Sequence, residues 1–209
     1  MKININPTTV LRTANGNFVV AHYSLGGQEG VSLTMGDITK GTPLLRLHSS
    51  CLFGESLGVI DCDCKLQLDR SLELIGKEGA GTLLYLYQEG RGIGLADKVR
   101  ALEIMRQQQC DTAAAFEQLG FPLDPRDYSM ALKMLDDLKM SENVRLISNN
   151  PQKFNALKGA GYNVIEQVTP SYEVNPLVFD YLKMKEAKLH HNISWEAIKL
   201  QPSEQTAQD

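Results

Sequence analysis

Three of the chain's four cysteines, Cys51, Cys62 and Cys64, fall within one short stretch, while Cys110 stands apart. Three thiolates around one Zn²⁺ leave its fourth position open, and an open zinc can hold and acidify a water. A closed, structural zinc would need a fourth ligand, for which His48 is the nearest candidate. Small buried thiols and a redox-active C-x-C pair are the alternatives, and we interpret Cys110 as a buried small residue. The clustering favours a metal site, in which Cys62 and Cys64 would point the same way on an extended segment.

A glycine-rich loop, QEGRGIG at residues 88–94, directly follows the apolar run TLLYLYQ. Ligands of α/β proteins bind outside the carboxyl ends of strands, where glycines allow close backbone approach. Glu89 can accept hydrogen bonds from a donor edge such as the N1–H and N2–H₂ of guanine, and Arg91 can bind a phosphate. A plain tight turn with two solvated charges is the alternative.

Two further loops carry polar groups that could meet an anion. Residues 124–127 read DPRD and residues 148–151 read SNNP, with Lys153 close behind. Each could be only a turn with a helix N-cap, or could offer amides, a hydroxyl or a cation to a phosphate. A Ser49–His48 catalytic dyad is disfavoured, because neighbouring side chains on a strand point to opposite faces. The cations at these expected strand ends and loops, which together fit a polyphosphate, are Arg46, Arg91, Arg126 and Lys153.

The elements that would position these groups follow from local patterns. Residues 9–24 predict a hairpin with a type I′ turn at Asn15-Gly16. Further predicted strands cover 31–38, 43–49, 82–88, 144–148 and 162–168. Predicted helices cover 67–78, 97–109, 130–138, 153–161 and 177–190. Strands that alternate with helices predict an α/β fold, a layered mixed β-sheet with flanking helices.

Composition limits the remaining possibilities. With 43% hydrophobic residues, 22% charged residues and a net charge of -4, the chain has no electrostatic footprint for nucleic acid or an anionic membrane. Neither a spanning segment nor a signal peptide is evident, so a cytoplasmic protein is expected, in which thiols stay reduced. The expected organisation is one domain over 1–192 and a partly disordered tail over 193–209.

The motifs together resemble the GTP cyclohydrolase II family, from about residue 8 to residue 191. The matching stretches are RLHSSC and CDCKLQL, LLYLYQEGRGIGLADKVRA, QLGFPLDPRDY, VRLISNNPQK and NPLVFDYLKMKEAKLHH. The resemblance implies a GTP cyclohydrolase II-like fold, a homodimer, and a zinc hydrolase that opens the imidazole ring of GTP in riboflavin biosynthesis. The implied products are formate, pyrophosphate and 2,5-diamino-6-ribosylamino-pyrimidinone 5'-phosphate, with Mg²⁺ on the nucleotide phosphates.

The resemblance also implies roles for individual residues. Cys51, Cys62 and Cys64 would hold the zinc, and Asp124 would be the proton acceptor. Arg126 would attack the α-phosphate or, because an arginine pKa lies above ~12, stabilise charge there. The implied nucleotide-binding residues are Arg46, Leu47, His48, Ser49, Ser50, Gln67, Glu89, Gly90, Arg91, Thr112, Ser148 and Lys153.

Two positions depart from the family pattern. Ser50 stands where the family has a glutamate, and Leu102 stands where it has a catalytic tyrosine. Leucine cannot transfer the proton that formate release needs. A divergent paralogue that stops at the formamidopyrimidine nucleotide, or acts on another purine nucleotide, is therefore an alternative. A non-catalytic nucleotide-binding module is a third reading, but such a module has no need of an open zinc site.

Overall fold

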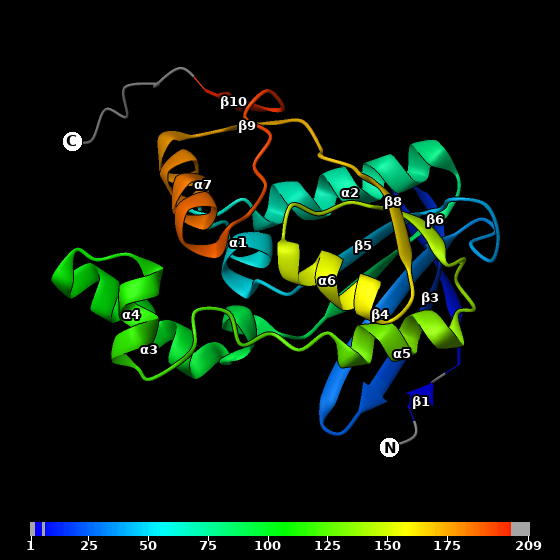
Figure 1. The fold of residues 1–209 in the computed structure, drawn as a ribbon, viewed down its shortest axis with the longest axis horizontal. Helices are drawn as coiled ribbons and strands as arrows, with labels where there is room; N and C mark the ends of the chain where they lie inside the picture. The colour runs from blue at the N-terminus through cyan, green and yellow to red at the C-terminus, as the bar shows by residue number, and fades with distance from the viewer. Residues whose placement is uncertain (1–2, 6, 202–209) are drawn as a thin grey trace.

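The computed structural model describes residues 3–5 and 7–201 of the 209-residue chain. One mixed sheet forms its centre (Figure 1), with strand order β1-β3-β4-β6-β5-β7-β8 and β2 paired to β3. The strands on the β1–β4 side are antiparallel, and β4 is antiparallel to β6, whereas β6, β5, β7 and β8 run parallel. The strands are β1 (Asn4–Ile5), β2 (Thr9–Thr13), β3 (Gly16–Leu25), β4 (Gln28–Met35), β5 (Leu44–Ser49), β6 (Gly81–Leu86), β7 (Asn143–Leu146) and β8 (Asn163–Gln167).

Helices flank this sheet, which confirms the predicted mixed α/β class. They are α1 (Leu52–Ser56), α2 (Cys64–Glu78), α3 (Leu95–Gln108), α4 (Thr112–Gln118), α5 (Ser129–Asp137), α6 (Pro151–Gly159) and α7 (Pro176–Leu189). A 3₁₀ turn, η1, covers Glu89–Gly92, and a two-stranded parallel sheet pairs β9 (Tyr172–Val174) with β10 (Ile198–Leu200). None of the described helices is long and apolar enough to cross a membrane.

Two apolar cores lie on opposite faces of the sheet, because successive strand residues point to opposite sides. Leu45 and Leu47 of β5 pack with residues of α5 and α6, while Leu44 packs with Ile75 of α2. Because both faces of β5 and β6 are covered, these strands read as nearly continuous apolar runs. Arg46 and His48 share the face of Leu44, and this places two buried polar side chains on the α2 side.

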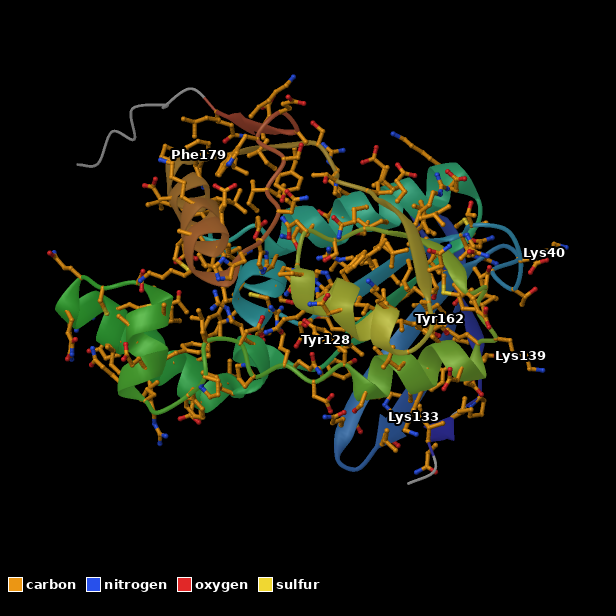
Figure 2. The ribbon with its side chains drawn as sticks, viewed as in Figure 1. Lys40, Tyr128, Lys133, Lys139, Tyr162 and Phe179 are labelled. Carbon is orange, nitrogen blue, oxygen red and sulfur yellow. The ribbon has the colours of Figure 1, made fainter. Side chains whose placement is uncertain are left out.

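The remaining elements form two smaller units beside the sheet (Figure 1). Helices α3 and α4 pack on each other around Ala101, Ala115 and Phe116. Helix α7 packs with β9 and β10, and Phe179 at its N-terminal end (Figure 2) contacts Trp195 with ring centroids 5.0 Å apart. In Figure 1, α3 and α4 lie at the lower left and α7 at the upper left, beside the sheet.

Several local expectations are corrected. The hairpin pairs Thr13 with Gly16, so its turn residues are Ala14 and Asn15, neither with positive φ, and not a type I′ Asn15-Gly16 pair. Cys62 and Cys64 do not lie on an extended segment, because Cys64 is already the first residue of α2. Strand pairing and helix packing outweigh these local preferences.

The C-terminal end contains more structure than its composition indicates. Strand β10 pairs with β9, and Ile193 and Ile198 are buried against α7. The domain boundary at residue 192 stays a prediction, and the part of the expected tail from 202 to 209 lies outside the described residues.

Candidate active site

A cavity of about 290 Å³ opens at the carboxyl ends of β5, β6 and β7. Because β5 and β6 are parallel and Ser49 pairs with Leu86, the segments that follow them leave the sheet side by side. Ser50 N donates to Leu86 O at 2.9 Å and fixes this juxtaposition. The predicted site residues among those that line the cavity are Arg46, His48, Ser49, Ser50, Cys51, Cys62, Cys64, Gln67, Glu89, Gly90, Arg91, Thr112, Arg126, Ser148 and Lys153.

Two predicted site residues do not line the cavity. The Leu47 side chain faces the α5 side of the sheet, so only its backbone oxygen serves this region, as the acceptor of a bond from Lys153 Nζ at 2.7 Å. Asp124 stands behind Arg126. The two residues form a bidentate salt bridge, in which Arg126 Nε lies 2.7 Å from Asp124 Oδ1 and Arg126 Nη2 donates to Asp124 Oδ2.

The three clustered thiols meet at one point of the cavity wall. Their sulfur atoms all lie within 4.8 Å of one another, with Cys51 and Cys62 Sγ 3.9 Å apart. Thiolates at about 2.3 Å from a tetrahedral zinc would be about 3.8 Å apart, so the group fits such an ion. Gly54 permits this approach, because a Cβ there would stand 2.4 Å from Cys62 Sγ.

His48 is not part of the thiol group, which corrects its candidacy as the fourth ligand of a closed site. Its Nε2 lies 2.9 Å from Glu55 Oε1, and its Nδ1 lies 3.2 Å from Arg46 Nη2. Tyr85 also donates to Glu55, at 2.6 Å. His48 and Glu55 therefore belong to a buried network under the cavity.

The pKa values of the three thiols are shifted in different directions. Hydrogen bonds from Cys62 and Cys64 lower the pKa of the Cys51 thiol, and the bond to Cys51 raises the pKa of Cys62 to about 11. Lys98 Nζ lies 3.3 Å from Cys51 Sγ and adds a positive charge beside it. Of the three thiols, Cys51 therefore ionises most readily.

Glu89 joins the glycine-rich loop to α1 and α3. Its Oε2 accepts from Leu52 N at 2.7 Å, and its Oε1 accepts from Gly90 N at 3.0 Å and Lys98 Nζ at 2.7 Å. The loop is therefore not a plain turn with solvated charges. Sequence reasoning missed Lys98, whose only signal was its place one turn into the helix after the loop.

Arg91 adopts a strained backbone conformation that points to a specific role. Its φ of 59° lies in the left-handed region, which costs a non-glycine residue about 1–2 kcal/mol. The guanidinium is held by Leu123 O at 3.3 Å, by the Tyr181 hydroxyl at 3.4 Å and over the Phe116 ring at 5.5 Å. Such strain persists where surrounding contacts require it, commonly at functional sites.

The floor of the cavity is cationic. Arg46 Nη1 donates to Ile147 O at 2.9 Å, and Nη2 donates to Gln67 Oε1 at 2.5 Å. Burial, together with the neighbouring Arg46 and Arg126, holds the pKa of Lys153 well below its usual value. These buried cations lack a full complement of anionic partners, so the floor favours an anionic ligand.

The two polar loops, 124–127 and 148–151, were each predicted to be either a turn with a helix N-cap or an anion-binding loop, and the structure differs between them. Arg126 is buried and paired with Asp124, not solvated. Burial lowers its pKa, but Asp124, Tyr128 and Tyr181 together raise it above its usual value. Asp127 accepts from Ser129 N at 2.9 Å, and α5 begins at Ser129. Asn150 caps α6 by accepting from Gln152 N at 2.8 Å and also lines the cavity, so that loop serves both purposes.

The C-terminal segment supplies cavity residues for which no role was predicted. They are Tyr181, Lys185, Leu189 and His191. Burial lowers the pKa of His191 to about 3, and its Nδ1 lies 3.1 Å from Asn149 Oδ1. The spacing of the 175–191 motif was visible in the sequence, but the direction of its side chains was not.

Both departures from the family pattern face the cavity. Ser50 and Leu102 belong to its lining, with Leu102 37% exposed. Among the described residues that line it, Tyr181 is the one tyrosine.

Comparison with known proteins gives concordant matches. The family model described as GTP cyclohydrolase II matches residues 4–169. A protein named GTP cyclohydrolase-2 from Shewanella amazonensis is 43% identical over 204 residues, 96% of this chain and 98% of its own length. Proteins of the same name from Hahella chejuensis and Azotobacter vinelandii are 48% and 46% identical, over 78% and 79% of this chain and 79% of each relative.

Proposed function

Because this chain belongs to the GTP cyclohydrolase II family, we propose that it is a zinc-dependent hydrolase that opens the imidazole ring of GTP. Formate, pyrophosphate and 2,5-diamino-6-ribosylamino-pyrimidinone 5'-phosphate are the proposed products. The observation that carries this proposal is the meeting of three thiols and a cationic floor in one cavity.

Cys51, Cys62 and Cys64 would hold the zinc. Their sulfur separations fit one ion, and no described His or carboxylate completes a four-ligand group. A zinc with an open position supplies Lewis acidity and lowers the pKa of a water to near neutrality. The protein's part is to keep the three sulfurs together and to place C8 of the purine beside them.

Glu89 and Gly90 would orient the base. Glu89 already accepts three hydrogen bonds, but a carboxylate has about four acceptor positions. Those bonds fix its direction, so a guanine N–H can add to it without reorganisation. Ser50 replaces the glutamate of the family pattern, so a preference for another purine nucleotide is the alternative to GTP.

The triphosphate would lie on the cationic floor. Arg46, Arg91, Arg126 and Lys153 border the cavity there, and Mg²⁺ would accompany the phosphates as it does in other phosphoryl-transfer sites. An anion would restore the charge that burial disfavours on Lys153. Ser148 and the Asn150 cap at the start of α6 add polar groups suited to phosphate oxygens.

Asp124 and Arg126 would act as a pair at the phosphate end. Burial raises the pKa of Asp124, but the Arg126 guanidinium outweighs burial and holds it below its usual value. The carboxylate is then ionised and can accept a proton. Arg126 is charged and fixed, which supports charge stabilisation over attack on the α-phosphate.

The early-stop alternative is favoured by one observation. Leu102 brings a methyl-terminated side chain to the cavity where the family pattern has a hydroxyl. Ring opening would not need that hydroxyl, but deformylation needs a further proton transfer. A protein with this defect would release pyrophosphate without an equal amount of formate.

The test is incubation of the zinc-loaded protein with GTP and Mg²⁺, followed by mass spectrometry and by formate and pyrophosphate assays. Equal amounts of formate and pyrophosphate support the proposal. A product that retains the formyl carbon supports the alternative, and nucleotide binding without turnover supports a non-catalytic module. Sedimentation or light scattering would test the predicted homodimer, and fractionation the predicted cytoplasmic location.

A further inference from the structure

The region after residue 169 lies outside the family match, yet it borders the proposed metal site. Helix α7 and strand β9 pack together in their own small core. From that core two polar side chains, Tyr172 and Lys185, reach the loop that carries Cys62 and Cys64.

Asp63, between those cysteines, is the point of contact. Its side chain is fully buried, and its two oxygens accept from three residues of different elements. Lys185 Nζ lies 2.7 Å from Oδ1, the Tyr172 hydroxyl lies 3.0 Å from Oδ2, and Gln67 Nε2 also bonds to Oδ2.

These contacts hold α7 in place and also stabilise the conformation of the loop that carries Cys62 and Cys64. Leaving a buried carboxylate without its counter-ion is strongly destabilising, so the shape of this loop depends on the presence of these partners. Gln67 connects Asp63 to the cavity floor, because its Nε2 donates to Asp63 and its Oε1 accepts from Arg46. One line of polar contacts thus runs from α7 through the cysteine loop to the floor.

The consequence for the thiols is geometric. Asp63 is joined to Cys62 and Cys64 by peptide bonds. A change in the backbone conformation of Asp63 would therefore turn both cysteine side chains away from Cys51. The close fit at Gly54, where a Cβ would stand 2.4 Å from Cys62 Sγ, leaves the loop little alternative room. Groups that orient metal ligands from behind commonly change metal affinity 10- to 100-fold when removed.

We propose that Lys185 and Tyr172, acting through Asp63, are positioning residues for the three-thiol metal site. The inference rests on the proposed zinc site but not on the reaction. The segment from β9 to α7 is then a part of the metal centre, and metal binding and docking of α7 stabilise each other by linkage.

The experiment measures Co²⁺ binding to full-length protein stripped of metal. The thiolate-to-cobalt charge-transfer band reports sulfur ligation, and the d–d bands report geometry. Lys185→Met removes the counter-ion with little loss of bulk. Lys183→Met is the matched control: it removes a lysine from the same helix whose Nζ lies 3.3 Å from Asp180 and is exposed.

Lys185→Met should weaken Co²⁺ binding roughly 10-fold or more and alter the d–d bands, while Lys183→Met keeps wild-type values. Wild-type affinity and spectrum in a folded Lys185→Met protein would overturn the inference. Tyr172→Phe removes only one hydroxyl and should weaken binding in the same direction, which keeps the test usable if Lys185→Met does not fold. An unchanged Tyr172→Phe would then count against the proposal.

A second readout tests the reciprocal effect. Zinc should slow amide hydrogen exchange in residues 176–189 of the wild type, and much less so in Lys185→Met. Equal slowing in both proteins would contradict the coupling. If the wild type binds neither Co²⁺ nor Zn²⁺, the proposed metal function fails; metal binding without GTP turnover would fault only the reaction.

Discussion

Lys98 Nζ stands 3.3 Å from the Cys51 sulfur and 2.7 Å from Glu89 Oε1. One cation therefore joins the thiol cluster to the loop proposed to orient the base. Three thiolates around a divalent ion carry a net negative charge, and Lys98 is placed to offset it. The proposed metal and base sites are thus mechanically and electrostatically connected.

Replacement of Lys98 should affect both sites. Lys98→Met removes the charge beside Cys51 and frees Glu89, so we expect kcat/KM for GTP to fall roughly 10- to 100-fold with weaker zinc retention. Steady-state kinetics and zinc analysis after dialysis measure the two effects. Lys65→Met, which removes an exposed lysine bound to Asp69 on α2, is the control; equal behaviour of the two variants would contradict the role of Lys98.

Gly54 tests the packing of the thiol group. Gly54→Ala places a Cβ 2.4 Å from Cys62 Sγ and 3.4 Å from Cys51 Sγ, so a sulfur must move. We expect loss of stoichiometric zinc and of GTP hydrolysis. Gly159→Ala, near the end of α6 with no atom within 4 Å of the added carbon, should retain both. Full zinc content in Gly54→Ala would show that the three sulfurs do not share one ion.

The Asp124–Arg126 pair should contribute to stability as well as activity. Asp124→Ala leaves a buried guanidinium unpaired, and we expect a loss of about 3–5 kcal/mol in the free energy of unfolding. Removing both charges, in Asp124→Ala with Arg126→Met, should recover part of that loss while activity stays absent. Urea unfolding measures the cycle, and additive destabilisation would mean that the pair is not coupled.

Leu102 is the position at which to test formate release. Leu102→Tyr restores a hydroxyl at the cavity, and we expect it to increase the rate of formate release relative to pyrophosphate. Leu102→Phe adds the ring without the hydroxyl and is the matched control. The same gain in both variants would assign the effect to packing, and no gain in either would show that another group, such as Tyr181, already transfers the proton.

Two buried histidines should make the protein sensitive to acid. Burial lowers the pKa of His48 to about 4 and that of His191 to about 3, whereas an imidazole in the unfolded chain titrates near 6.5. Below pH 6.5 these two imidazoles bind protons in the unfolded chain but stay neutral in the folded protein. The contribution of the two neutral imidazoles to the free energy of unfolding is therefore fully present above pH 6.5. As the pH falls below 6.5, the free energy of unfolding decreases by up to about 1.4 kcal/mol per pH unit for each imidazole.

His191→Gln measures this contribution. Its free energy of unfolding should fall less steeply than that of the wild type between pH 6.5 and 5, as chemical denaturation at fixed pH can show. Above pH 7 the difference between the two proteins should be constant. Parallel curves below pH 6.5 would contradict a neutral buried His191.

Residue types and their order are enough to predict most of the helices and strands and to suggest the chemistry of the cavity. Cys51, the glycine-rich loop and the loop of Ser148 each follow an apolar strand, and the carboxyl ends of parallel strands lie at one edge of a sheet. That regularity is why residue order alone predicts that these three segments lie together, as the cavity lining shows. Cys62, Cys64 and Arg126 follow helices instead and reach the same cavity through tertiary packing. Helices α4 and α1 and strands β9 and β10 were not predicted, because short elements give too little periodic signal.

Which side chains support the site depends on long-range packing. Lys185 is 122 residues from Asp63 in the chain, and their pairing is fixed by the docking of α7, which no local pattern encodes. Likewise Leu47 turned away from the cavity because of its register on β5, and Cys64 was drawn into α2 rather than an extended segment. Local spacing specifies which groups a chain carries, whereas burial and long-range packing specify which of them face each other.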